Sequence, residues 1–416
     1  MNATLDQLFC EKELIEWTQK LISIPSHTAS ACRERDLAAF LMQLLEQEGI
    51  ECRLQPADGD RCNVIAMLHG DGTGPSLMLN GHMDTVPVEG MDDPFGAQIR
   101  DGILYGRGAA DMKSGLAAML YAFVLIHRSG IPLRGDVVFA GVIDEEAAKS
   151  TGSRVIAQQG PHTDFAIVGE PTALFPVIAH NGIDYFEIRF HGKSAHSSRP
   201  ENGANAIYAA ADFARYVRDV LAPLYKSKVH PLVGSAAINA GLIQGCAHIN
   251  RGFLLGTDET FAGVVPDETS LFVDVRWTPD QTIEEVTLQL EQAAEQVRST
   301  NPGVEVQVHY IPLPRPAMEI SADSCLVKAM IQNISTFSPQ TAQPQGVTYF
   351  ADSGILYGVG HISSMIFGPG DIAVAHSPGE CVAVDQICKA GRIYAQTIAD
   401  VCGQSSHETK GENHER

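Results

Sequence analysis

The chain has 416 residues, of which 44% are hydrophobic and 19% charged, as is ordinary for a globular protein with a sizeable core. Its 29 basic and 50 acidic residues give a net charge of −21, which disfavours nucleic acid and anionic membranes as partners. No apolar run approaches the roughly 18 residues that cross a bilayer and no secretory signal opens the chain, so we expect a cytoplasmic protein of about two or three domains.

The first part of the chain alternates helical and strand patterns. Strands separated by helices predict a largely parallel sheet with helices on both faces. In chain order, the predicted elements are helices at 8–24 and 33–48, strands at 63–68 and 76–79, a long apolar helix at 115–127, and strands at 136–143 and 165–168.

The pattern changes near Asp184, where alternating polar and apolar residues indicate half-exposed strands. The order that follows is β-α-β-β-α-β, which is that of a ferredoxin-like module with an antiparallel sheet backed by two helices. The predicted elements are a strand at 185–191, a helix at 204–221, strands at 235–243 and 269–276, a helix at 283–298 and a strand at 304–310.

After residues 312–316 the first pattern returns, with a helix at 322–334, a strand at 363–367 and a helix at 385–401. The predicted fold class is therefore α/β, with a mostly parallel-sheet main domain covered by helices and an inserted ferredoxin-like α+β domain. The predicted boundaries are 1–183 and 312–402 for the main domain, 184–311 for the inserted domain, and 403–416 for a disordered polar tail.

Nine cysteines are scattered along the chain, and no two of them form a C-x-x-C pair. An odd and dispersed set is not the pattern of a disulfide framework or of a structural zinc site. We therefore expect free thiols.

Acidic residues and histidines follow the predicted strands of the α/β part. In an open α/β sheet, the carboxyl ends of the strands form the edge where ligands bind. Carboxylates that gather there repel one another unless cations neutralise them. Imidazole with carboxylate suits zinc, with cobalt or manganese as alternatives, so the pattern predicts a hydrolytic centre of two divalent metal ions. The residues concerned are His82, Asp84, Asp111, Asp144, Glu145, Glu146, Glu170 and His376.

Each of these residues also has a plainer interpretation when it is taken singly. A lone histidine after a strand more often serves packing, and an acidic run often begins a solvated helix. The joint pattern is more specific than its members. Competing motifs are incomplete: Met112 stands where a phosphate loop needs glycine, and the chain has neither an HExxH nor a GxSxG motif.

With these motifs assembled, the sequence resembles the dinuclear-zinc amidohydrolase and exopeptidase family of acetylornithine deacetylase, succinyl-diaminopimelate desuccinylase, carboxypeptidase G and aminoacylase-1. The resemblance covers residues 7–402 and is closest to the acetylornithine deacetylase branch. In that family the inserted module is a lid and dimerisation domain. The matching segments are Gly81-His-Met-Asp-Thr-Val-Pro87, Gly106-Arg-Gly-Ala-Ala-Asp-Met-Lys-Ser-Gly115, Asp144-Glu-Glu146, Gly169-Glu-Pro171, Gly192-Lys-Ser-Ala-His-Ser-Ser198, Val265-Pro-Asp267, and Gly368-Pro-Gly370 with Ala375-His376.

The resemblance implies a ligand set for the two metal ions. Asp111 bridges both ions, His82 and Glu170 complete one, and Glu146 and His376 complete the other. The peptide bond after Asp111 is expected to be cis, as it often is in the family.

The resemblance also implies catalytic roles. Asp84 accepts a hydrogen bond from the second ring nitrogen of His82 and fixes its tautomer. Glu145 is the general base, which takes a proton from a metal-bridging water and later gives it to the leaving nitrogen. His196, from the lid of the partner subunit, reaches the oxyanion.

Two further residues are expected to bind substrate. Arg276 resembles the family arginine that holds a substrate carboxylate, and a salt bridge with Asp274 is the alternative. Gly263 stands where the family usually has an asparagine, and an extra segment at about 248–261 precedes it. Asn250 is the candidate for that asparagine's role, which is otherwise lost.

The leading functional hypothesis is an enzyme that hydrolyses the C–N bond of a small N-acyl amino acid. A dipeptidase or carboxypeptidase, and an aminohydrolase of a small aromatic amino acid, are alternatives with the same centre. A catalytically silent binding protein on this fold is the competing class, although neither a ligand nor the base is missing here. The implied partners are a small carboxylate-bearing substrate and a second copy of the chain, which pairs through the inserted domain.

Overall fold

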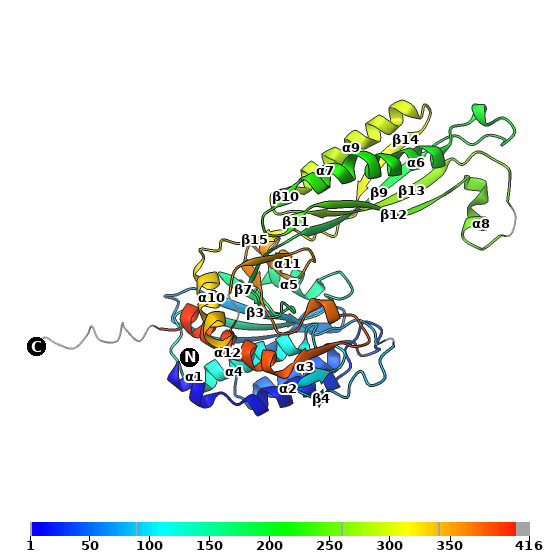
Figure 1. The fold of residues 1–416 in the computed structure, drawn as a ribbon. Helices are drawn as coiled ribbons and strands as arrows, with labels where there is room; N and C mark the ends of the chain where they lie inside the picture. The colour runs from blue at the N-terminus through cyan, green and yellow to red at the C-terminus, as the bar shows by residue number, and fades with distance from the viewer. Residues whose placement is uncertain (1, 89, 259–260, 340–341, 405–416) are drawn as a thin grey trace, which may run out of the picture. The chain divides into compact units, whose positions relative to one another are not determined.

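The computed structural model describes residues 2–88, 90–258, 261–339 and 342–404 (Figure 1). The chain divides into two compact units. Unit 1 combines the chain up to Ala179 with Met318–Gly346 and with the chain from Ala351 onward, and unit 2 is His180–Ala317 with Val347–Phe350. The sequence placed the limits of the inserted module at 184 and 311, which lie a few residues inside those of unit 2.

Unit 1 is built on a mixed sheet of nine strands in the order β1-β2-β6-β3-β7-β17-β8-β15, with β16 paired to β8. The middle four strands, β6, β3, β7 and β17, are parallel to one another. The bounds of the sheet strands are β1 Cys52–Asp58, β2 Arg61–Leu68, β3 Leu77–His82, β6 Val137–Val142, β7 Phe165–Val168, β8 Val177–His180, β15 Met318–Glu319, β16 Gln345–Val347 and β17 Ser363–Ile366.

Helices cover both faces of this sheet. Side chains of α5 and α11 pack with strand residues in one hydrophobic cluster, and α4 packs on β3 from the other face. A small sheet of β4, β5 and β18 lies apart from the main one. The remaining bounds in unit 1 are α1 Ala3–Leu8, α2 Glu11–Ser23, α3 Arg35–Gln47, β4 Gln98–Arg100, β5 Ile103–Tyr105, α4 Lys113–Ser129, α5 Thr151–Gln159, α10 Cys325–Phe337, α11 Ser353–Gly358, β18 Cys381–Ala383 and α12 Val384–Cys402.

Helix α4 is apolar on every side, as its sequence predicts, and its residues from Lys113 to Ile126 are all buried. Its first turn approaches the main chain after β7 closely. A Cβ atom at Gly115 would lie 2.1 Å from the carbonyl oxygen of Gly169, so no side chain fits there. Glycine therefore allows the segment before α4 to lie beside the end of β7.

The antiparallel pair β1–β2 is a difference from the predicted sheet, which had no strand at 52–58. Strand β1 contains Pro56 and is exposed at most positions, as an edge strand tolerates. It therefore lacks the continuous apolar run by which its buried neighbours are recognised. The fold class itself is confirmed.

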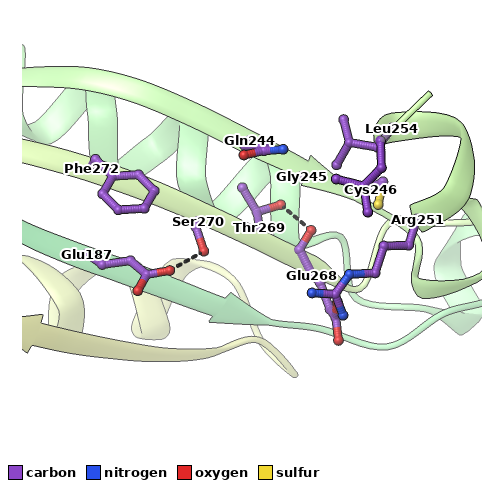
Figure 2. Close-up of a pocket in the computed structure, with 11 residues that line it drawn as sticks. Glu187, Gln244, Gly245, Cys246, Arg251, Leu254, Glu268, Thr269, Ser270 and Phe272 are labelled. Carbon is purple, nitrogen blue, oxygen red and sulfur yellow. Dashed lines mark hydrogen bonds between the residues drawn. The ribbon is translucent and has the colours of Figure 1, made fainter. Parts of the chain in front are cut away.

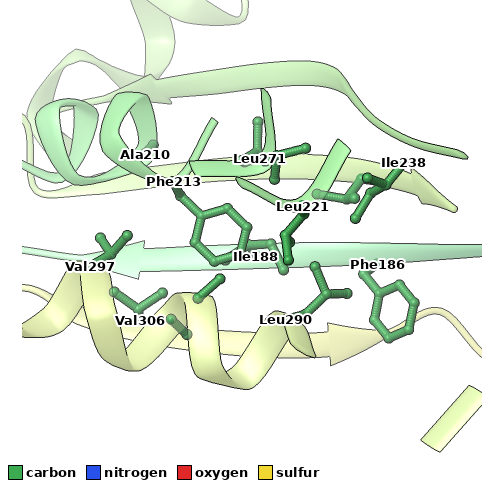
Figure 3. Packing of buried hydrophobic residues seen from close by; sticks show 14 of the residues in the cluster. Phe186, Ile188, Ala210, Phe213, Leu221, Ile238, Leu271, Leu290, Val297 and Val306 are labelled. Atoms are coloured by element: carbon green, nitrogen blue, oxygen red, sulfur yellow. The ribbon is translucent and has the colours of Figure 1, made fainter. Parts of the chain in front are cut away.

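Unit 2 contains the predicted ferredoxin-like module, a four-stranded antiparallel sheet in the order β12-β13-β9-β14. Along β13 buried and half-buried residues alternate, and the buried ones face the helices in a single core (Figure 3). The bounds are β9 Gly182–His191, α6 Ala206–Tyr216, α7 Ala222–Ser227, β10 Val229–His230, β11 Gly234–Ser235, β12 Ala237–Cys246, α8 Arg251–Leu254, β13 Glu268–Trp277, α9 Ile283–Thr300 and β14 Glu305–Tyr310.

Three other expectations concern cysteines, the tail and membranes. All nine cysteines are free thiols, as predicted. Most of the predicted disordered tail, residues 405–416, lies outside the described residues, whereas the amides of Gly403 and Gln404 donate to Ala399 and Pro132. Within the described ranges, no helix combines the length and the hydropathy that crossing a membrane requires.

Burial of His180, at the end of β8, predicts that the fold loses stability in acid. Its side chain is fully buried, its Nδ1 contacts the main-chain oxygen of Asn181 at 2.8 Å, and burial lowers its pKa to about 4. The unfolded chain binds the proton near pH 6.5, so this contribution to stability is complete above pH 6.5 and disappears as the pH falls towards 4. At 1.36 kcal/mol per pKa unit, protonation removes about 3 kcal/mol.

We therefore expect the free energy of unfolding, from urea titrations at pH 7.5 and pH 4.5, to fall less in His180→Gln than in the unmodified protein. Exposed His69 provides the control. Between pH 7.5 and pH 4.5, His69→Gln should lose as much unfolding free energy as the unmodified protein. Equal pH dependence in the unmodified protein and His180→Gln would show that His180 is protonated without cost in the folded state.

Candidate metal centre

The carboxyl ends of the four parallel strands meet at one edge of the unit 1 sheet. Strand β3 ends at His82, and Glu145 and Glu146 follow β6. Glu170 follows β7, and the loop after β17 carries His376. Because these strands are neighbours in the sheet, residues that are far apart in the sequence lie together.

Asp111 is at the centre of this group. Its Oδ1 is 3.0 Å from His82 Nε2, and its Oδ2 is 3.1 Å from His376 Nε2. His82 Nε2 is also 3.6 Å from Glu170 Oε1, and His376 Nε2 is 3.0 Å from Glu146 Oε2. The five predicted ligands therefore lie together as two sets of three. His82 and Glu170 form one set with Asp111, and Glu146 and His376 form the other with the same aspartate.

The protonation of these groups reflects their crowding. Burial and the charge of Asp111 raise the pKa of Glu170 to about 8. Hydrogen bonds with Asp111 and Glu146 raise the pKa of His376 to about 10. Burial favours the neutral form of Asp111, but hydrogen bonds from His376 and His82 hold its pKa below the ordinary value. Carboxylates packed this closely need protons or cations to neutralise their charge.

The donor set fits divalent cations. One atom each from His82, Asp111 and Glu146 lie within 4.8 Å of one another. The Oε1 atoms of Glu146 and Glu170 are buried without a hydrogen-bond partner. Unsatisfied carboxylate oxygens beside two imidazole nitrogens are what a pair of metal ions would complete.

Glu145 is partly buried beside this group. Burial, together with the charges of Glu170 and Asp352, raises its pKa well above the ordinary value. A raised pKa makes a carboxylate a stronger base, which favours its taking a proton from water as a general base in hydrolysis does. The position and the environment of Glu145 thus suit the role expected for it.

Asp84 makes other contacts than those expected. The main-chain oxygen of Asp84, not its carboxylate, makes the 2.9 Å contact with His82 Nδ1, and the nearest carboxylate oxygen is 3.7 Å away. The carboxylate accepts the amides of Glu145 and Glu146 at 3.2 and 3.0 Å. The turn after β6 offers amide groups that compete for the carboxylate. Asp84 therefore orients both His82 and the Glu145–Glu146 turn, through different atoms.

Asp144 stabilises the turn that carries Glu145. Asp144 is buried, adopts a φ of 70°, and pairs with Arg61 at 3.0 Å. Arg61 also binds Glu34 at 2.5 Å. His376, a residue of the centre, also has a positive φ, of 60°. The expected cis peptide Asp111–Met112 is confirmed.

The remaining predicted site residues, His196, Arg276 and Asn250, belong to unit 2. His196 is exposed, and its Nδ1 accepts hydrogen bonds from the amide and the hydroxyl of Ser198, which leaves Nε2 as the donor. Arg276 Nε contacts Asp274 Oδ1 at 3.1 Å, the pairing that was its alternative role. This contact uses one of the three guanidinium nitrogens.

Both polar atoms of the Asn250 side chain make hydrogen bonds within the extra segment. Its side chain is buried, its Nδ2 donates to Ala262 O at 2.9 Å, and its Oδ1 accepts from Ala262 N at 2.7 Å. These two bonds close the base of the extra segment. The same base pairs with the histidine loop, since Ser197 N donates to Gly263 O and His196 bridges to Val264.

A pocket of about 320 Å³ lies in unit 2 between the extra segment and the sheet face that the helices leave open (Figure 2). Phe272, Leu254 and Leu255 supply its apolar surface, and the charged groups of Glu187, Arg251 and Glu268 line it as well. None of the predicted site residues lines this pocket.

Sequence reasoning assigned no role to several buried charged residues. Asp352 accepts a hydrogen bond from Ser153, and its charge helps to raise the pKa of Glu145. Glu380 pairs with Arg107. Glu380 follows His376 by four residues, so its position near the motif was the one available signal. Burial of Asp352 and Arg107 could not be read from residue type, because charged residues are usually exposed.

The sequence matches peptidase family M20/M25/M40 over residues 78–400. The acetylornithine deacetylase of Myxococcus xanthus is 30% identical over 355 residues, which are 84% of this chain and 87% of that protein. The N-formyl-4-amino-5-aminomethyl-2-methylpyrimidine deformylase of Bacillus subtilis is 27% identical, and the alignment covers 96% of each chain.

Among solved structures, a dinuclear metal-binding peptidase of family M20 from Bacillus subtilis superposes with a TM-score of 0.70 at 17% identity and covers 93% of this chain and 97% of its own. At this identity the likeness shows the common fold, and the sequence match shows the family. The resemblance drawn from the motifs is thereby confirmed. The chain belongs to peptidase family M20/M25/M40, and it is a metal-dependent hydrolase that acts on amide or peptide bonds.

Proposed function

We propose that this enzyme hydrolyses the amide bond of a small N-acyl amino acid at a centre of two divalent metal ions. The observation that carries the proposal is the position of Asp111, whose two oxygens face two different histidines, each accompanied by a glutamate. The relatives named as acetylornithine deacetylase and as a deformylase support cleavage of a small acyl group from nitrogen.

In this proposal His82 and Glu170 would hold one ion, Glu146 and His376 would hold the other, and Asp111 would serve both. Zinc is the metal we propose, with cobalt and manganese as alternatives, because nitrogen and carboxylate ligands suit all three. When bound, such a pair polarises a carbonyl group and makes water more acidic. The side chain of His376 is 54% exposed, so the centre has an open side from which substrate can approach.

The chain's own residues carry out the proton transfers. The Glu145 carboxylate takes a proton from the attacking water as its oxygen bonds to the amide carbon. The protonated carboxyl group then donates this proton to the nitrogen as the C–N bond breaks, which returns Glu145 to its starting state. His196 donates from Nε2 to the carbonyl oxygen as that oxygen gains negative charge, and Arg276 binds the substrate carboxylate.

The test of the substrate class is a panel of N-acetyl, N-formyl and N-succinyl amino acids, dipeptides and aminobenzoic acids, each assayed with zinc, cobalt and manganese. We expect the highest kcat/KM on an N-acyl amino acid. A dipeptide or an aromatic amine as the best substrate would overturn the proposed class and leave the metal centre intact.

Dimerisation through unit 2 predicts that two inactive variants restore each other's activity. If His196 completes the site of the partner subunit, His196→Ala and Glu145→Gln are each inactive, yet mixing them should restore activity. After unfolding and refolding at a 1:1 ratio, half of the dimers are mixed, and each has one complete site, so about a quarter of the full activity returns. The measurement is hydrolysis after refolding the mixture.

The control is each variant refolded alone, which should stay inactive. No recovery in a mixture whose sedimentation shows dimers would mean that His196 acts within its own subunit or not at all. A chain that sediments only as a monomer would exclude dimerisation itself.

A further inference from the structure

Glu380 has contacts that link two loops of the metal centre. Its Oε1 accepts the main-chain amides of Ala110 and Asp111, both at 3.0 Å. Its Oε2 is 2.5 Å from Arg107 Nη1. The side chains of Glu380 and Arg107 are 1% and 2% exposed, so the carboxylate and the guanidinium are both withdrawn from water.

The contacts of Glu380 join two loops that are far apart in the sequence. Glu380 lies four residues after His376 in the loop that follows β17, whereas Asp111 lies in the loop before α4. Its main-chain oxygen also accepts the amide of Gly106, at the start of the Asp111 loop. Three hydrogen bonds and one ion pair therefore join the segment of His376 to the segment of Asp111.

We propose that Glu380 is a positioning residue, which holds Asp111 and His376 at the separation that the metal ions require, with Arg107 balancing its charge. The inference rests on the proposed metal centre. Glu380 binds the amide of Asp111 and leaves both carboxylate oxygens of Asp111 free to face the histidines. Residues that orient metal ligands commonly change metal affinity by about 10–100-fold when they are replaced.

A purely structural ion pair is the competing explanation, and a second arginine–glutamate pair, far from the centre, serves as the control. Arg128 pairs with Glu48 at 2.6 Å in the same unit. Arg128 is 15 residues beyond the start of α4 at Lys113, about 22 Å along the helix at 1.5 Å per residue. Glu48→Gln therefore breaks an arginine–glutamate pair that is remote from the centre.

The test variant is Glu380→Gln, which keeps the shape of the side chain and one oxygen that can accept the two amides. The group that faces Arg107 becomes an NH₂ group, which cannot accept a hydrogen bond, or an uncharged oxygen, which accepts one more weakly. Cobalt(II) is titrated into metal-free protein, and its affinity and visible spectrum are recorded with the melting temperature of the metal-free chain. We expect cobalt(II) affinity to fall by about 10–100-fold, and the spectrum of the saturated variant to change. Glu48→Gln should keep the unmodified affinity and spectrum.

A lower melting temperature with unchanged cobalt(II) affinity and spectrum would reduce Glu380 to a structural role. If Glu380→Gln does not fold, Arg107→Lys keeps a positive charge with different geometry, and it should weaken cobalt(II) binding in the same direction. Unchanged binding in that variant would likewise overturn the inference. Failure of the unmodified chain to bind cobalt(II) would contradict the metal centre itself, which keeps the two proposals distinguishable.

Discussion

Glu145→Gln should lower kcat by about 10²–10⁴-fold, the usual contribution of a positioned general base. The substitution keeps the size of the side chain and removes its ability to carry the proton between water and the leaving nitrogen. KM should change little, because the expected loss concerns the transition state more than substrate binding. The measurement is steady-state hydrolysis of the best substrate of the panel.

Metal content is the control for this variant. Glu145→Gln should retain both ions, whereas Glu146→Gln, one residue further on, should lose metal, since the Glu146 carboxylate contacts His376 within the centre. Activity of Glu145→Gln close to that of the unmodified enzyme would exclude Glu145 as the base. Loss of both metal ions from Glu145→Gln would assign it a ligand role instead.

Asp111→Asn should have the other large effect. An amide of the same size removes the one negative charge that faces both histidines. Metal ions contribute several kcal/mol to hydrolysis, and 1.36 kcal/mol corresponds to a factor of ten. We therefore expect activity to fall by about 10³-fold or more, together with metal content measured after dialysis.

Asp101→Asn is a matched control for this substitution. Asp101 is exposed and adopts a φ of 51°, a conformation that asparagine also tolerates. It should keep normal metal content and activity. Two metal ions per chain in Asp111→Asn, with activity preserved, would contradict the bridging role.

The extra segment that contains Asn250 is joined to the loop of His196. Its base is closed by Asn250 and Ala262, and the next residues pair with the loop of His196. Sequence comparison identified the insertion and suggested a substitute ligand for substrate. The hydrogen bonds show that both polar atoms of the asparagine side chain bind Ala262, a contact partner 12 residues away.

The strands that surround the centre were predictable because they are buried on both faces and therefore apolar throughout. Strand β7 was expected at 165–168 and is found at Phe165–Val168. Elements at the edges were missed, since short or exposed strands such as β1 and β4 lack a continuous apolar run or a full alternating pattern. Boundaries elsewhere shift by a few residues, where capping and tertiary contacts decide the end of an element.

By itself, the sequence determined the order of the elements, the two-part organisation and the residue types that gather at the strand ends, because periodicity and motif spacing are local properties. The tertiary structure alone decided which atoms meet. It set each oxygen of Asp111 against a different histidine, gave the carboxylate of Asp84 to the turn after β6, and paired Glu380 with Arg107 across 273 residues. Such contacts depend on how distant segments pack, and no local pattern encodes that packing.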